Sequence, residues 1–327
     1  MKYGLFFFFL LNRSLFFGQD IHWTQFNDNP LFQNPGNTGG FKEDFRFVAN
    51  YRNQWRSVTV PYSTSSFSFD TKYKNWGLGF LTFHDQVGDG KLSTLEGQLN
   101  ISRPLTFNTL SGHVFRPGVT FGFNYRQVNW GLLYFDNQYN GYVFDPNAPS
   151  NESFQSDSKM NANLGVGIVD DWTFNDRWKI NTGLACFNLN RPNQGFYNEV
   201  VKRDLRWSLF TKANYFLNEE WVIQPSIQFT QQGTYQELMM GGLARYVFSK
   251  RNQIQLYGGL WWRNKDALAM NVAYEKGPLY VGLSYDINYS KLVPASKARG
   301  GFELSFKYVI SRFKPKQIIH RVCPDFI

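Results

Sequence analysis

Apolar and polar residues alternate along most of this chain, most regularly between residues 278 and 310. Every second residue is apolar from position 279 to 289, and the pattern resumes from 302 to 310 after a loop. A period of two over about eleven residues predicts long β-strands with one apolar and one polar face. In a soluble sandwich the apolar face would be buried in a core, whereas in a membrane barrel it would meet lipid.

Segments with this alternation recur after residue 43, and we count fourteen of them. Most have nine to fifteen residues. This exceeds the roughly five or six residues of strands in globular proteins and approaches the roughly 9–11 residues of a tilted membrane-spanning strand. The predicted strands are 44–54, 63–71, 75–84, 91–103, 113–127, 161–170, 178–189, 204–216, 220–230, 235–248, 252–263, 267–275, 278–289 and 299–310.

The connections between these strands differ in length according to the rim on which they would lie. Those after even-numbered strands are short, whereas residues 128–160 and 190–203, after odd-numbered strands, form long loops. This sorting is typical of outer-membrane barrels. We therefore predict an all-β fold, a closed antiparallel transmembrane β-barrel of about 14 strands over residues 43–311. Glu303 of the last strand is expected near Arg46 of the first, inside the lumen.

The composition also favours a barrel. Aromatic residues make up 19% of the chain, and a barrel places them in an outer apolar band and two girdles. The mean hydropathy of -0.40 excludes a bundle of membrane helices. Residues 1–18 resemble a secretory signal peptide, with Lys2 before an apolar run and Gly18 at its end. The barrel would then lie between a periplasmic N-terminal arm (19–42) and a periplasmic C-terminal tail (312–327).

Charge matters mainly inside the predicted lumen. The formal net charge is +9, and it would be +7 without residues 1–18, which contain two basic residues and no acid. The basic residues are spread over the polar faces of several strands, so no nucleic-acid-binding face is predicted. Two alternatives stay open, namely cross-strand ion pairs that fill the lumen and a pore selective for anions. The residues concerned include Arg46, Arg52, Arg116, Arg206, Asp70, Glu96, Asp286 and Glu303.

The sequence contains no clear catalytic or metal-binding pattern. None of the 4 His residues has metal-ligand spacing, and no glycine-rich phosphate loop leads from a strand into a helix. His84 stands at a strand end, and some outer-membrane lipases place Ser and His on neighbouring strands, but a local nucleophile signature is missing. We expect no catalytic residue, no cofactor, no metal, and no disulfide between Cys186 and Cys323.

Four ordered blocks of sequence resemble the PorP/SprF family of outer-membrane proteins of the type IX secretion system. The first is QFNDNPLFQNP at residues 25–35, and the second is NYRNQW at residues 50–55. The third is NRPNQGF at residues 190–196, and the last set of matching residues lies within 262–303. The resemblance spans the chain after residue 18 and keeps the order of the blocks, which makes it more specific than any single block.

The resemblance implies a non-enzymatic protein of the cell outer membrane with a role in protein secretion and gliding motility. Members help to secrete or hold a large surface adhesin by binding its C-terminal domain, and they couple to periplasmic components of the secretion system. The implied partners are these proteins and outer-membrane lipid, with no nucleic acid. The chain departs from the family at Gly36, where Ala is frequent, and at Phe187, where a His is expected.

The arm contains two Asn-Pro pairs, Asn29-Pro30 and Asn34-Pro35. A residue before Pro favours an extended backbone, so the pairs predict a stiff, polar arm. Such an arm could plug the lumen, dock on a partner, or simply lead into the first strand.

The two long loops are the predicted partner-binding surface. Tyr and Trp side chains offer large contact areas, and exposed aromatic residues on adaptable loops are frequent in binding sites. The first loop could instead continue an aromatic girdle or fold inward over the pore. The candidate residues are Trp130, Tyr134, Phe135, Tyr139, Tyr142 and Phe144 in the first loop, and Asn190, Pro192, Asn193 and Phe196 in the second.

Two other functions compete with a protein-binding barrel. An outer-membrane channel for small or hydrophobic solutes, similar to the fatty-acid transporter barrels, would need an open lumen or a lateral gap. A lipid-modifying enzyme would need the nucleophile signature that the sequence lacks.

Overall fold

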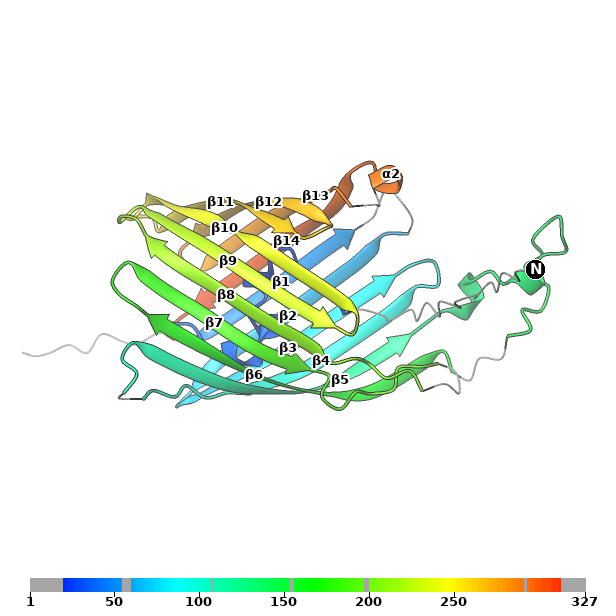
Figure 1. Ribbon diagram of the computed structural model, residues 1–327, viewed down its shortest axis with the longest axis horizontal. Coiled ribbons are helices and arrows are strands. Elements are labelled where there is room, and N and C mark those ends of the chain that lie inside the picture. Colours follow the sequence, from blue (N-terminus) through cyan, green and yellow to red (C-terminus); the bar gives the residue numbers. More distant parts are fainter. Residues whose placement is uncertain are drawn as a thin grey trace, which may run out of the picture.

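The computed structural model describes residues 20–54, 60–107, 109–152, 156–196, 200–290 and 293–312. They form a closed antiparallel barrel in which each strand pairs with its neighbours in sequence and β1 pairs with β14 (Figure 1). The predicted fold class is therefore confirmed. The predicted signal peptide, most of the predicted tail, and Trp55 and Cys323 lie outside the described residues.

The strands have 10 to 16 residues each. They are β1 Phe45–Gln54, β2 Tyr62–Tyr73, β3 Trp76–Val87, β4 Leu92–Ser102, β5 His113–Gln127, β6 Ser158–Thr173, β7 Trp178–Phe187, β8 Arg206–Phe216, β9 Trp221–Gln232, β10 Tyr235–Ser249, β11 Ile254–Arg263, β12 Ala267–Lys276, β13 Leu279–Asn288 and β14 Arg299–Ile310. Short helical turns are η1 Phe26–Asp28, α1 Pro30–Gln33 and η2 Pro35–Asn37 before the barrel, and η3 Trp130–Leu132, η4 Asp136–Gln138 and α2 Val293–Ser296 in loops.

Every predicted strand corresponds to an observed strand. The bounds of β5 and β14 agree with the prediction, and the others differ by at most three residues at either end. The largest difference is in β6, which begins at Ser158 rather than at residue 161. Its extra residues pair with β5 as far as Gln127, so hydrogen bonding extends the strand beyond the segment in which the side chains alternate clearly.

The two faces of the wall differ as the alternation predicts. On β5, the outward Val119 and Phe121 are 52% and 60% exposed, whereas the inward Thr120 and Asn124 are buried. The outer surface is thus a band of apolar side chains, and most inward positions are polar. Among the described residues, no helix is both long and apolar enough to cross a membrane.

The connections define two rims. The short-turn rim contains the turns after even-numbered strands, and the long-loop rim contains the connections after odd-numbered strands, including residues 128–157 and 188–205. The predicted proximity of Glu303 and Arg46 is wrong, because Glu303 pairs with Arg52, and Arg46 lies opposite Val309. In an antiparallel pair the early part of β14 meets the late part of β1, so Glu303 cannot reach the start of β1.

Candidate functional site

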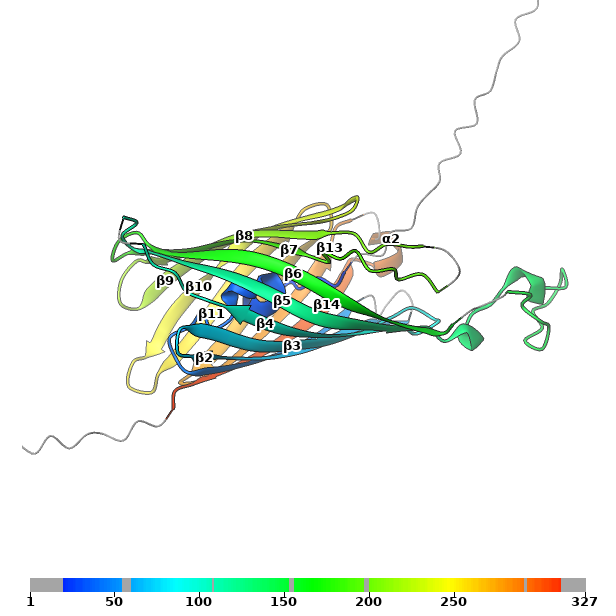
Figure 2. The ribbon, with the colours of Figure 1, turned by 90° about the horizontal axis from the view of Figure 1, so that it is seen from below.

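Residues 20–44, called here the N-terminal arm, lie inside the barrel (Figure 2). At the long-loop rim, the backbone N–H of Asp20 donates to the side chain of Gln232 at the end of β9 (2.7 Å). At the short-turn rim, the N–H of Asp44 donates to the carbonyl of Ile310 (3.1 Å). The arm therefore crosses the lumen from one rim to the other before the chain enters β1. The sequence left open a plug, a docking arm and a simple lead-in to the first strand. A position inside the lumen is that of a plug.

The first anchor of the arm is a buried cluster of charges around Asp20. Its carboxylate accepts from Arg203 of the β7–β8 loop (2.6 Å) and pairs with Arg206 of β8 (3.3 Å). Burial alone would raise the pKa of Asp20, but the two guanidinium groups hold it below its usual value. Arg203 also donates to Glu96 of β4 (2.9 Å). It thereby connects the arm, the loop and the wall.

Aromatic rings support this anchor. The guanidinium of Arg206 lies 4.3 Å from the ring centroid of Phe32 in the arm and 4.1 Å from that of Phe187 in β7. Phe187 is the position at which the family resemblance led us to expect a His. In this chain the ring at that position makes a cation–π contact with an arginine that binds the arm.

The second anchor is Glu303 of β14. Its carboxylate accepts from the backbone N–H groups of Thr24 and Gln25 and from the guanidinium of Arg52, each at 2.8 Å. Asp286 of β13 accepts from the Thr24 hydroxyl (2.9 Å) and from Arg52 (2.7 Å). All five residues are buried. Buried carboxylates with several donors strongly favour one arrangement, because any shift of the arm would remove the hydrogen bonds that Thr24 and Gln25 donate to them.

Apolar contacts hold the helical part of the arm. Phe32 meets Phe83 of β3 edge to face, with ring centroids 5.8 Å apart, and Phe26 meets Trp261 of β11 at 5.0 Å. Leu31 is 0% exposed. Burial of a large apolar side chain stabilises by roughly 1.5–3 kcal/mol. The arm is therefore packed against the wall like part of a hydrophobic core.

The two Asn-Pro pairs shape the arm. Pro30 begins α1 and Pro35 begins η2, where the missing N–H of Pro sacrifices no helical hydrogen bond. The side-chain oxygen of Asn34 accepts from the N–H of Gly36 (2.8 Å) and caps η2. The amides of Asn29 and Asn34 donate to β2 and β6 of the wall. The pairs thus initiate compact turns rather than a continuous extended segment.

Gly36 fits the closest approach between the arm and the wall. A Cβ atom at this position would lie 2.4 Å from the carbonyl oxygen of Arg116 in β5, and one on Gly118 would lie 2.5 Å from the Gly36 nitrogen. The side chain of Arg116 also donates to the Gly36 carbonyl (3.0 Å). The departure from the Ala of the family thus has a steric reason here.

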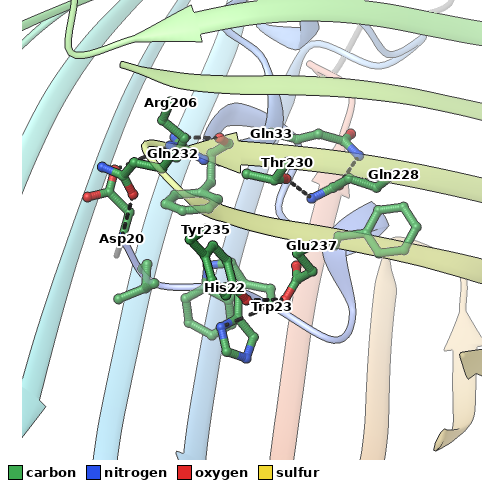
Figure 3. Close-up of a pocket in the computed structure, with 13 residues that line it drawn as sticks. Asp20, His22, Trp23, Gln33, Arg206, Gln228, Thr230, Gln232, Tyr235 and Glu237 are labelled. Atoms are coloured by element: carbon green, nitrogen blue, oxygen red, sulfur yellow. Dashed lines mark hydrogen bonds and ion pairs between the residues drawn. The ribbon is translucent and has the colours of Figure 1, made fainter. Parts of the chain in front are cut away.

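A small cavity remains between the arm and strands β8 to β10 (Figure 3). Its volume is about 20 Å³, which is room for about one water molecule. The labelled residues of Figure 3 come from both the arm and the wall, and their side chains converge on this space. The arm thus leaves only a small space against strands β8 to β10.

His22 lines this cavity. Burial and the positive charges of Arg263 and Arg52 lower the pKa of His22 well below its usual value. The nearest carboxylate is that of Glu237 in β10, 3.9 Å from Nδ1, which is too far for a hydrogen bond. His22 is therefore neutral at neutral pH.

Further ion pairs lie on the inner face of the wall. Arg46 binds Asp70 through two hydrogen bonds of 2.9 and 2.8 Å, and Arg263 donates to Asp286 (3.1 Å). This arrangement agrees with the first of the two alternatives for the lumen. The contacts of Asp20, Thr24 and Gln25 were not predicted from the sequence. The sequence signal that could have indicated an arm in the lumen was the number of inward-facing charged residues on strands far apart in the chain.

The β5–β6 loop projects well beyond the barrel, as the green segment in Figure 1. Near its tip, the ring of Phe144 packs against Tyr134 (4.6 Å) and Tyr139 (5.5 Å). Tyr142 is 95% exposed and Tyr134 is 74% exposed. The N–H of Phe135 donates to the side-chain oxygen of Gln138, the last residue of η4 (3.1 Å). Tyr134, Tyr139 and Phe144 thus form an aromatic cluster in the loop, and Tyr142 of the same segment is exposed.

The remaining predicted residues connect the two long loops. Trp130 of the first loop meets Phe196 of the second edge to face, with ring centroids 5.9 Å apart. The side chain of Asn190 binds the backbone of β6 at two points. The side-chain oxygen of Asn193 accepts two N–H groups within its own loop, and the carbonyl of Pro192 accepts from the N–H of residue 203 (2.9 Å). Asn190 and Asn193 therefore shape the second loop.

Candidate chemistry outside the lumen is sparse. Within the described part of the chain, no group of three His, Cys, Asp or Glu residues could hold a metal ion. His84 Nε2 lies 2.9 Å from the hydroxyl of Ser93 on β4, so the structure does place a Ser beside this His. The adjacent Asp85 accepts instead from the hydroxyl of Thr64 (2.6 Å). Among the residues that the structure describes, no carboxylate binds His84, so the His84–Ser93 pair has no orienting acid of a triad there.

The profile of one protein family, described as "Type IX secretion system membrane protein PorP/SprF", matches residues 15–308. Among solved structures, the chain is similar to the Ralstonia pickettii toluene transporter TbuX, with a TM-score of 0.53, 10% identity, and coverage of 86% of this chain and 93% of that chain. It is also similar to the Pseudomonas putida toluene transporter TodX, with a TM-score of 0.51, 12% identity, and coverage of 86% and 91%. These likenesses concern the fold alone. No curated protein matches the chain.

Proposed function

Because this chain belongs to the PorP/SprF family of type IX secretion system membrane proteins, we propose that it helps to secrete or hold a large surface adhesin. The barrel lies in the outer membrane and binds the C-terminal domain of the adhesin without catalysing a reaction. In this proposal residues 1–18 are removed during export, the long-loop rim faces outward, and the short-turn rim and the C-terminal tail face the periplasm.

The observation that carries the proposal is a lumen filled by the arm below an exposed aromatic loop. A filled lumen speaks for a binding platform rather than for a channel for small or hydrophobic solutes. The exposed tyrosines of the β5–β6 loop, with Tyr142 95% exposed, offer contact area to a protein partner. The second loop is tied to the wall and the arm through Arg203. We assign it the role of supporting the first loop.

The test replaces residues 130–144 with a Gly/Ser linker of equal length. The strands keep their pairing in this variant, so the barrel should assemble and show the usual heat-dependent migration on a denaturing gel. The aromatic contact area is lost, and we expect the adhesin to disappear from the cell surface. Surface adhesin is measured with an antibody on intact cells.

A matched control replaces only residues 145–150, which lie in the same loop beyond the aromatic cluster, with Gly/Ser. It should display the adhesin as the wild type does. Normal display by an assembled 130–144 variant would contradict the assignment of this loop as the capture site.

A further inference from the structure

A pocket of about 380 Å³ opens at the short-turn rim, where the end of the arm meets β2, β3 and β5. Its lining carries four cationic side chains, Lys42, Lys72, Lys74 and Arg116, against one carboxylate, Asp171. Arg116 forms an ion pair with Asp171. Among the described residues, none of the three lysines forms an ion pair with a carboxylate. The pocket lining therefore carries a net positive charge, which the carboxylates of Glu43 and Asp44, close to Lys72, offset only in part.

The backbone and an aromatic ring shape this pocket. Gly39 has a φ of +67°, and a Cβ atom on it would lie 2.9 Å from the Cα of Gly77 in β3. The arm and β3 are thus in backbone contact along one side. The ring of Phe41 has Arg46 at 4.6 Å and Lys72 at 5.1 Å from its centroid. Such contacts restrict the lysine side chain before any partner arrives.

We propose that this pocket binds an acidic segment of a soluble protein, with carboxylates of the segment facing Lys42, Lys72 and Lys74. The volume lies within the roughly 300–1,000 Å³ of ligand pockets, and carboxylates complement the unpaired ammonium groups. The proposal rests on the proposed function in one respect, namely that the short-turn rim faces the periplasm. The partner is then a periplasmic component of the secretion system.

The position of the pocket favours a protein over a lipid. Lys72 and Arg116 belong to the inward face of the wall, and residues 38–42 of the arm form the adjoining surface. The pocket is therefore reached from the water in front of the barrel mouth. A lipid headgroup in the membrane would lie against the outer face of the wall, away from Lys72 and Arg116. Lys74 lies nearer that face, with its ammonium group 5.6 Å from the ring centroid of the exposed Tyr73.

The test measures binding of a fluorescein-labelled hexaglutamate peptide to the purified full-length barrel in a zwitterionic detergent, by fluorescence anisotropy. We expect saturable binding that weakens as salt is added. The double variant Lys72→Gln/Lys74→Gln should weaken it by about tenfold or more, because it removes two of the three unpaired charges. The control Arg251→Gln/Lys276→Gln changes one residue in the β10–β11 turn and the last residue of β12, both at the same rim. It lowers the net charge equally and should bind like the wild type.

Three outcomes would overturn the proposal. They are the absence of saturable binding, equal weakening in both double variants, and displacement of the peptide by phosphatidylglycerol nanodiscs, which would assign the pocket to lipid. The variant with residues 130–144 replaced should bind the peptide normally. A failure of the pocket is therefore distinguishable from a failure of the adhesin proposal, which is measured on cells with a different variant.

Discussion

Glu303 determines the position of the arm more directly than any other single wall residue described above. It accepts two backbone N–H groups of the arm and also a guanidinium group of β1. If the carboxylate were lost, the two N–H groups would be buried without this partner, and Arg52 would keep only Asp286 as a carboxylate partner. Removal of one member of such a group costs several kcal/mol, because the remaining charge stays buried and unpaired.

We therefore expect Glu303→Gln to lower the free energy of unfolding by about 3 kcal/mol. The amide keeps one acceptor oxygen but turns an NH₂ group toward donors. Unfolding by urea in detergent micelles, followed by circular dichroism, measures the difference. The control Glu219→Gln removes an exposed carboxylate that pairs with Lys250, and its midpoint should equal that of the wild type. Equal midpoints for all three proteins would refute the anchoring role of Glu303.

His22 predicts a pH dependence. Its pKa in the folded protein is lowered by burial and by Arg263 and Arg52, while in the unfolded chain it is about 6.5. Below about pH 6.5 His22 binds a proton in the unfolded chain but stays neutral in the folded protein. The free energy of unfolding therefore decreases as the pH is lowered, by at most about 1.4 kcal/mol per pH unit. Asp20 adds no slope there, because its lowered pKa confines its titration to below about pH 4.

The measurement compares urea midpoints between pH 8 and pH 5 for the wild type and for His22→Gln. The wild type should lose stability over the lower half of this range, and the variant should lose less. A wild-type profile with the same slope as the variant would show that His22 does not titrate differently on folding.

At the level of elements, the strands and the arm differ in how far the sequence predicts them. Alternation is a local property, and each strand's own residues decide which face meets lipid, so all fourteen strands were predicted to within three residues. The arm has no period, and its partners lie on strands from β1 to β14. Only the Asn-Pro pairs marked it. Its place in the lumen depends on contacts such as Thr24 with Asp286, 262 residues apart in the chain.

Deletion of residues 20–40 should convert the barrel into a pore. The deletion removes the packed segment but leaves every strand pairing intact, so the lumen gains a continuous water-filled path. Single-channel recordings in planar bilayers should show a larger conductance than the wild type. The barrel with residues 130–144 replaced serves as the control and should conduct like the wild type.

Assembly of the deletion variant is checked first by heat-dependent migration on a denaturing gel. An assembled variant that conducts no better than the wild type would mean that other residues close the lumen.

Considered as a whole molecule, the barrel has two ends of different character. The long-loop rim carries exposed aromatic residues, and the short-turn rim carries a basic pocket. The candidate loops were predictable because their length and aromatic content stand out in the sequence. The basic pocket was not, because Lys42, Lys72 and Arg116 come from three separate elements that only the closed barrel brings together.

The path of the arm also constrains how the molecule can be built. Asp20 lies at one rim, while β1 begins at the other, so the chain passes through the lumen of its own barrel. Once β1 and β14 have joined, the ring encircles the thread and a folded domain attached ahead of Asp20 could no longer pass. With such a domain attached, the strands would have to close around an arm that is already in place, and the fusion partner would emerge among the long loops.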